Sequence, residues 1–99
     1  MSSAQPLLTT RPEVQTDNKV ATEKLWKVVV WNDPVTPMPV VTLVFKKIFG
    51  YPQEKAEQLM MTVHHEGRAI VWSGGQDRAE HYVVQLHVHG LLATMESDD

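Results

Sequence analysis

The chain has 99 residues, 42% of them hydrophobic, which is enough for one domain with one modest core. It contains no cysteine, so disulfide bonds, thiolate zinc sites and cysteine nucleophiles are excluded, and a cytoplasmic protein is expected. The formal net charge of −3 argues against a nucleic-acid partner, and no apolar run approaches the roughly 20 residues that a membrane span needs.

The first 24 residues differ in composition from the rest of the chain. They are rich in Ser, Thr, Gln, Pro and charged residues, and their few apolar residues follow neither a helical nor a strand period. We therefore expect a flexible N-terminal extension over residues 1–24 and a core domain over residues 25–99. The core begins at residues 25–31, where β-branched and aromatic side chains around a single charge, Lys27, predict a strand with at least one covered face.

Two helices are predicted next. Residues 36–39, Thr-Pro-Met-Pro, are typical of a helix start, because threonine caps free N–H groups and proline is tolerated in the first turn. Apolar residues then recur at helical spacing as far as Ile48, and Gly50 ends the helix. Pro52 opens the second helix, whose apolar stripe recurs at i, i+3, i+4 and i+7 until Gly67 ends it.

The remainder of the chain alternates strand and helix. We expect a strand over residues 68–72, a loop over 73–75, a helix from Asp77 to Gly90 and a strand over 91–95. The predicted order is therefore β-α-α-β-α-β. Three strands and three helices without an internal repeat favour an α+β domain of two layers, in which the helices back a three-stranded antiparallel sheet.

Polar residues at the ends of the first strand and the second helix are the candidate functional residues. Asn32 and Asp33 directly follow the strand, and His64 lies four residues after Met60 on the same face of the helix. If this helix packs beside the start of the first one, apolar side chains form a small cavity with the three polar groups at its mouth. The expected apolar lining is Met38, Val41, Met60 and Val63.

The chemistry of these polar groups indicates the kind of ligand. Asp offers only hydrogen-bond acceptors, Asn offers a carbonyl oxygen, and a neutral His offers one acceptor nitrogen. Together they suit a cation with several N–H donors, such as a primary ammonium. With an apolar cavity behind it, such a site fits the N-terminus of a peptide whose first side chain is bulky and apolar.

Two segments in fixed order carry a resemblance to a known family. The first is Asn-Asp at 32–33 followed by Thr-Pro-Met at 36–38, after a valine-rich strand. The second is Leu-Met-Met-Thr-Val-His at 59–64 followed by Glu-Gly-Arg-Ala at 66–69. Over roughly residues 25–96 the chain resembles ClpS, the adaptor that hands proteins with destabilising N-terminal residues to a Clp AAA+ ATPase and its protease.

The resemblance implies a fold, a ligand and a partner. The implied fold is a helix-backed three-stranded sheet similar to the C-terminal domain of a ribosomal stalk protein. The resemblance implies neither catalysis nor a cofactor. The implied ligands are N-degrons, polypeptides that begin with Leu, Phe, Tyr or Trp, and the implied partner is a Clp ATPase. The resemblance assigns Asn32, Asp33 and His64 to the α-amino group, and Thr36, Met38, Val41, Met60, Val63 and Leu91 to the side-chain pocket. We expect a monomer with no nucleic-acid or membrane partner.

The chain departs from the family pattern at two positions that bear on these partners. Pro34 stands where many members have a second Asp, so one carboxylate and one backbone donor are missing at the rim. Tyr82 stands where some members carry a lysine that docks on the ATPase, so the expected partner is a Clp ATPase of the ClpC type, with the ClpA type as the alternative. In the family, an extension such as residues 1–24 is engaged by the ATPase pore during delivery.

The same residues can also be explained by purely structural roles that involve no ligand. Asn-Asp-Pro at 32–34 is typical of a turn, and a histidine at a helix C-terminus commonly stabilises the helix dipole. Met60 and Val63 would ordinarily be core residues. The alternative function is therefore a ribosomal-stalk-like interaction domain that does not recognise peptide N-termini.

Five histidines raise a zinc site and an enzyme as further hypotheses. His64 and His65 are neighbours in a helix and point about 100° apart, while His87 and His89 point about 200° apart, so neither pair converges on one ion. Among the carboxylates, only Asp33 is expected at an apolar cavity, as acid–base catalysis would require. We therefore expect neither a bound metal nor enzymatic activity.

Overall fold

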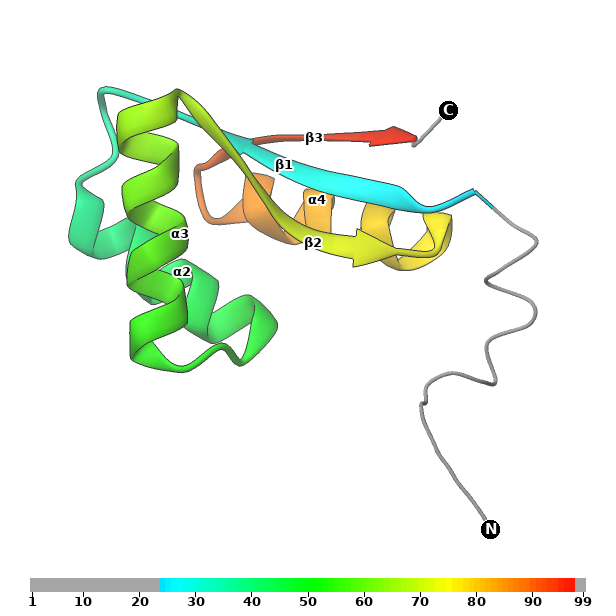
Figure 1. The fold of residues 1–99 in the computed structure, drawn as a ribbon, viewed down its shortest axis with the longest axis horizontal. Helices are drawn as coiled ribbons and strands as arrows, with labels where there is room; N and C mark the ends of the chain where they lie inside the picture. The colour runs from blue at the N-terminus through cyan, green and yellow to red at the C-terminus, as the bar shows by residue number, and fades with distance from the viewer. Residues whose placement is uncertain (1–23, 98–99) are drawn as a thin grey trace, which may run out of the picture.

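The computed structural model describes residues 24–97 (Figure 1). Its elements are β1 (Trp26–Trp31), α2 (Met38–Phe49), α3 (Gln53–Glu66), β2 (Arg68–Gly74), α4 (Gln76–Val88) and β3 (Leu92–Ser97). The predicted β-α-α-β-α-β order and the α+β class are confirmed. The predicted flexible extension lies, apart from Lys24, outside the described residues.

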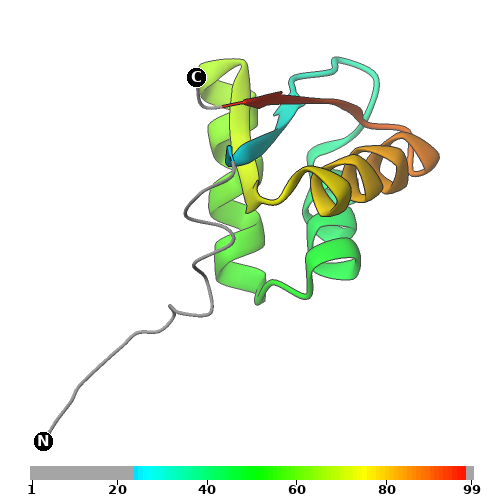
Figure 2. The same ribbon diagram turned by 90° about the vertical axis from the view of Figure 1, so that its right-hand side faces the viewer.

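The three strands form one antiparallel sheet in the order β2-β1-β3. The central position of β1 explains its valine run, because Val28, Val29 and Val30 are at most 1% exposed. In Figure 1, α4 runs beneath the sheet, and α2 and α3 stand at the end where β1 stops and β2 starts; Figure 2 shows the same arrangement from the side. Within residues 24–97, the opposite face of the sheet carries no helix.

The hydrophobic core fills the space between the sheet and the helices. Val28 and Val30 face the helices and pack with Phe45 of α2 and Leu86 of α4, both of which are fully buried. Burying each of these larger side chains contributes about 1.5–3 kcal/mol. Val63 of α3 belongs to the same core, so packing rather than helix propensity fixes where α2 and α3 stand relative to the end of β1.

Strands β2 and β3 are longer than the sequence predicts. Ser73 and Gly74, expected in a loop, belong to β2, and β3 runs from Leu92 to Ser97 rather than over 91–95. The cause is tertiary, since β1 pairs along its whole length and Trp26 faces Gly74 on one side and Ser97 on the other. Helix α4 correspondingly begins at Gln76, one residue earlier than expected.

An irregularity in β2 explains the glycine at its end. The register shifts between Val28 and Val29, so that both Val71 and Trp72 pack against the core side of the sheet. The Trp72 ring lies so close to Gly74 that a Cβ at this position would overlap it, whereas a Cβ at Gly75 would meet no atom within 4 Å.

Serine substitutions at these adjacent glycines are expected to have different effects on stability. Gly74→Ser should lower the free energy of unfolding by about 1–3 kcal/mol, because the Trp72 ring must move. Gly75→Ser should leave stability unchanged or slightly higher, since Gly75 caps α4 and serine is a favourable N-cap residue. Urea unfolding followed by circular dichroism measures both changes, and an equal loss in the two variants would contradict the packing described.

Candidate functional site

A cavity of about 330 Å³ opens where the end of β1, the start of α2 and the C-terminal half of α3 meet. It is lined by Val30, Trp31, Asn32, Asp33, Pro34, Thr36, Pro37, Met38, Val41, Met60, Val63, His64 and Leu91. All nine residues that the sequence assigned to a peptide N-terminus are among them. The nine come from α2, α3, the β1–α2 loop and the residue before β3, so the fold brings together positions up to 59 residues apart, from Asn32 to Leu91.

The inner lining of the cavity is apolar and fixed. Val41, Val63 and Leu91 are buried within the core, which holds their side chains in place. Met38 is 42% exposed and Met60 is half-buried, so methionines form the part of the wall that reaches solvent. Because methionine is unbranched and polarizable, this part of the wall adapts to the shape of an entering side chain.

Asp33 shapes the loop between β1 and α2. Its Oδ1 accepts a hydrogen bond of 2.9 Å from the backbone N–H of Val35, and its Oδ2 accepts one of 3.0 Å from the Thr36 hydroxyl. This is the side-chain-stabilised turn that Asn-Asp-Pro predicts. Each carboxylate oxygen retains a further lone pair, so the turn does not exhaust the acceptor capacity of Asp33.

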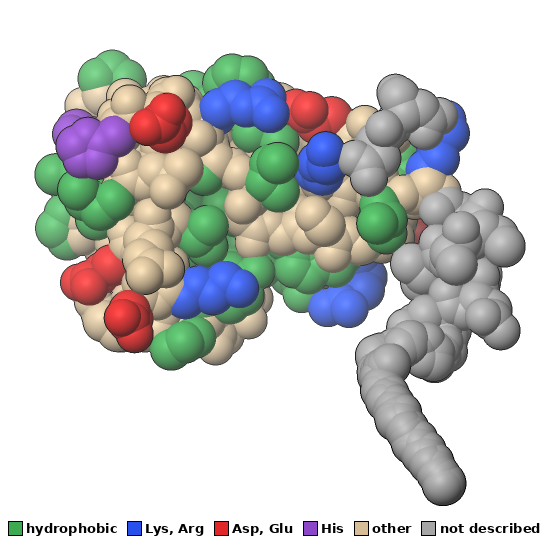
Figure 3. Space-filling view, in the orientation of Figure 1, with side chains coloured by type: hydrophobic (Ala, Val, Ile, Leu, Met, Phe, Trp, Pro, Cys, Tyr) green, Lys and Arg blue, Asp and Glu red, His purple; other side chains and the backbone are tan. Residues whose placement is uncertain are grey.

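A backbone contact brings Asn32 close to the end of α3. The N–H of Asn32 donates to the carbonyl oxygen of Gly67 over 2.9 Å, and Gly67 ends α3 with a left-handed φ of 91°. His64 lies in the last turn of the same helix, and Figure 3 shows histidine side chains at the surface over this end of α3. The contact therefore places the amide of Asn32 and the imidazole of His64 at the mouth of one cavity.

The side chains of Asn32 and His64 make no hydrogen bond to the protein within residues 24–97, although the His64 ring meets that of His65 edge-on at 5.2 Å. Their polar atoms are thus open to a ligand. Together with the remaining lone pairs of Asp33 they offer oxygen and nitrogen acceptors beside an apolar cavity, an arrangement that suits a cationic donor attached to an apolar group.

The sequence did not assign four residues that line the cavity: Val30, Trp31, Pro34 and Pro37. Val30 was expected as a strand residue, and its position in the cavity wall follows only once β1 is known to end at the cavity.

Residues 24–97 contain no group of three or more His, Cys, Asp or Glu side chains that could hold a metal ion. None of the helices in this part of the chain is both long and apolar enough to span a bilayer.

Similar known proteins belong to one family. The family model described as ATP-dependent Clp protease adaptor protein ClpS matches residues 21–94. The ClpS adapter protein of Nocardia farcinica is 52% identical over 79 residues, covering 80% of this chain and 74% of that protein. That of Corynebacterium efficiens is 46% identical over 98 residues, 97% of each chain.

A solved structure shows the same fold. ClpS2 of Agrobacterium tumefaciens, determined with bound L-phenylalaninamide, matches with a TM-score of 0.67 and 32% identity, covering 76% of this chain and 98% of that one. The matches favour an adaptor over the ribosomal-stalk-like domain and the enzyme that were considered as alternatives. The chain belongs to the ClpS family of ATP-dependent Clp protease adaptor proteins.

Proposed function

We propose that this adaptor binds the free α-ammonium group and the bulky first side chain of polypeptides that begin with Leu, Phe, Tyr or Trp, and delivers them to a Clp AAA+ ATPase in the cytoplasm. The observation that carries the proposal is the convergence of an acceptor rim and an apolar lining in one cavity. In the proposed complex, Asn32, Asp33 and His64 hold the ammonium. L-Phenylalaninamide, the ligand of the similar ClpS2, has the same two features, a primary amine and an apolar side chain.

The expected affinity follows from the two halves of the ligand. Each hydrogen bond to a charged group contributes about 1.5–3 kcal/mol, and burial of a Leu or Phe side chain adds about 1.5–3 kcal/mol. Association costs several kcal/mol in lost translational and rotational freedom. A dissociation constant in roughly the micromolar range is therefore expected for a short peptide bound by a monomeric adaptor.

Met38 is the proposed source of selectivity against β-branched first residues. It reaches solvent at the start of α2, where the first Cβ of a bound peptide would pass, and one methylene more or less in an apolar pocket changes affinity only about 10- to 200-fold. Strong exclusion of Val and Ile therefore needs a steric clash rather than missing contacts. Met38 supplies that clash in the proposed complex.

Peptides that differ only in their first residue test the proposal. Wild-type protein should bind those starting with Leu, Phe, Tyr or Trp more than about 200-fold more tightly than those starting with Val or Ile, which exceeds the effect of missing contacts, as measured by fluorescence polarization. Met38→Ala should reduce this preference by about tenfold. Leu43→Ala, a control on the same helix at an exposed residue outside the cavity, should not. Equal binding of all first residues to wild type would contradict the proposal.

We place the contact with a ClpC- or ClpA-type ATPase on α4. Tyr82, which replaces the lysine of some relatives, packs against Phe49 and Trp72 with ring centroids 4.7 and 4.9 Å apart. Its hydroxyl accepts a hydrogen bond of 2.8 Å from Arg78, whose guanidinium lies over the Trp72 ring. Arg78 thus holds a positive charge one helical turn before the lysine position, on an exposed face of α4.

A further inference from the structure

The face of the sheet opposite the helices carries exposed apolar side chains in neighbouring strands. Trp31, Ile70 and Leu92 are 38%, 43% and 55% exposed. Trp31 of β1 pairs with Leu92 of β3, and Val29 of β1 pairs with Ile70 of β2, so all of them point to this same face. Figures 1 and 2 show no described helix over it.

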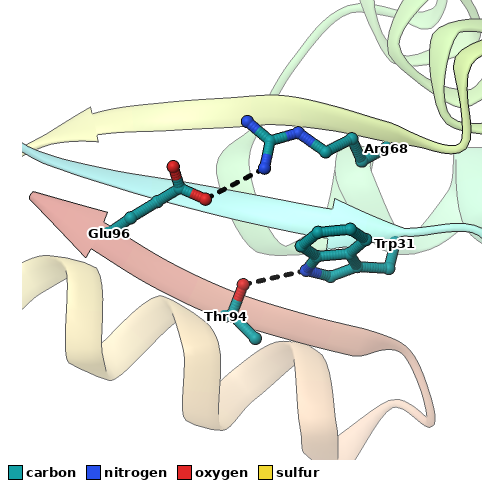
Figure 4. Close-up of polar contacts among 4 residues, drawn as sticks. All are labelled: Trp31, Arg68, Thr94 and Glu96. Carbon is teal, nitrogen blue, oxygen red and sulfur yellow. Dashed lines mark hydrogen bonds and ion pairs between the residues drawn. The ribbon is translucent and has the colours of Figure 1, made fainter.

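Polar contacts hold the tryptophan of this face in one orientation. The indole Nε1 of Trp31 donates a hydrogen bond of 2.8 Å to the Thr94 hydroxyl, and the Arg68 guanidinium lies 5.2 Å from the indole ring. Arg68 also forms an ion pair of 3.0 Å with Glu96 across the sheet (Figure 4). We call Trp31, Arg68, Ile70, Leu92, Thr94 and Glu96 the outer patch.

The side chains of the outer patch account for the burial of Val29, but much of their own apolar surface stays exposed to solvent. Val29 points outward and is nevertheless 0% exposed, because the side chains around it cover it. A purely structural cover for Val29 would not require Ile70 and Leu92 to remain about half exposed. Rigid aromatic surface flanked by exposed aliphatic side chains and framed by polar groups is typical of a surface that binds a partner.

The outer patch is continuous with the proposed ammonium site. Trp31 belongs to the outer patch and also lines the cavity, and it directly precedes Asn32. Arg68 directly follows Gly67, whose carbonyl oxygen accepts the hydrogen bond from Asn32. Asn32 is therefore adjacent to the outer patch in sequence, and three residues separate His64 from Arg68.

We propose that the outer patch receives the second to fourth residues of the bound polypeptide and favours aromatic or large aliphatic side chains there. This inference rests on the proposed function, because the first residue must be anchored in the cavity. Once it is anchored, the following residues are held near the patch at high effective concentration, so weak apolar contacts add to the affinity. Substrates are then ranked by their first four residues rather than by the first alone.

Two eight-residue peptides test this, both starting with Phe and carrying either Trp-Leu-Leu or Ser-Ser-Ser at positions 2–4. Wild-type protein should bind the apolar peptide about three- to tenfold more tightly. In Ile70→Ser and in Leu92→Ser the ratio of the two affinities should fall toward one. The control Val84→Ser, at a residue of α4 whose exposure lies between those of Ile70 and Leu92, should keep the wild-type ratio. Damage to the cavity itself would weaken both peptides alike and cancel in the ratio.

Each remaining outcome has a definite meaning. Equal binding of both peptides to wild type would overturn the outer patch alone, whereas failure of both peptides and of phenylalaninamide to bind would contradict the proposed function itself. Self-association of the wild type that is lost in Leu92→Ser would assign this face to a second copy of the chain and also overturn the inference. Light scattering of the same samples measures that association.

Discussion

Replacing Asp33 with asparagine is expected to weaken the binding of a peptide that starts with Phe by about 10- to 100-fold. The substitution removes the negative charge that we propose faces the ammonium, and a hydrogen bond to a charged group contributes about 1.5–3 kcal/mol. It retains an oxygen that can accept the 2.9 Å hydrogen bond from Val35, so the loop and the free energy of unfolding should change little. Calorimetric titration and urea unfolding measure the two quantities.

Two further variants separate the charge of Asp33 from its part in the turn. Asp33→Ala removes both the charge and the contacts with Val35 and Thr36, so it should lower stability as well as affinity. Glu66→Gln removes one negative charge from an exposed residue that does not line the cavity, and it should leave affinity within about twofold. If Asp33→Asn bound as tightly as wild type, Asp33 would have only the turn role.

Eight of the nine predicted site residues lie in two segments that are each local in sequence, whereas Leu91 was assigned by the family resemblance alone. Asn32 and Asp33 sit where a valine strand must end, and Met60, Val63 and His64 share a helix face by spacing alone. Two short segments in fixed order then carried the family resemblance. A role of Asp33 in the turn does not exclude a role in ligand binding. Its oxygens accept hydrogen bonds from Val35 and Thr36, and Asp33 also lines the cavity.

What the sequence could not show depends on contacts between distant segments. The pair Gly74-Gly75 resembles a loop, yet pairing with Trp26 draws Gly74 into β2 while Gly75 caps α4. Because side chains alternate between the two faces of a strand, Val29 would be expected to face solvent, but side chains of β1, β2 and β3 cover it. The sequence did not indicate a functional role for Trp31, because the two surfaces to which it belongs, the cavity and the outer patch, exist only after the sheet has formed.

Acetylation of the peptide N-terminus is expected to have the largest effect of all. It replaces an ammonium by a neutral amide, leaving one N–H donor where there were three and adding bulk at the mouth of the cavity. Loss of two charge-assisted hydrogen bonds, each worth about 1.5–3 kcal/mol, corresponds to more than 100-fold in affinity. The apolar half of the ligand alone should not hold a peptide at micromolar concentration.

The most direct measurement is a polarization titration of one Phe-initiated peptide, labelled at its C-terminus, in three forms: free, acetylated at the N-terminus, and acetylated only on an internal lysine. The two acetylated forms lose the same charge, so they differ only in where the amine is blocked. The free and lysine-acetylated peptides should bind with equal, roughly micromolar affinity, and the N-terminally acetylated peptide should show no saturable binding. Equal affinity of all three forms would contradict recognition of the α-ammonium at Asn32, Asp33 and His64.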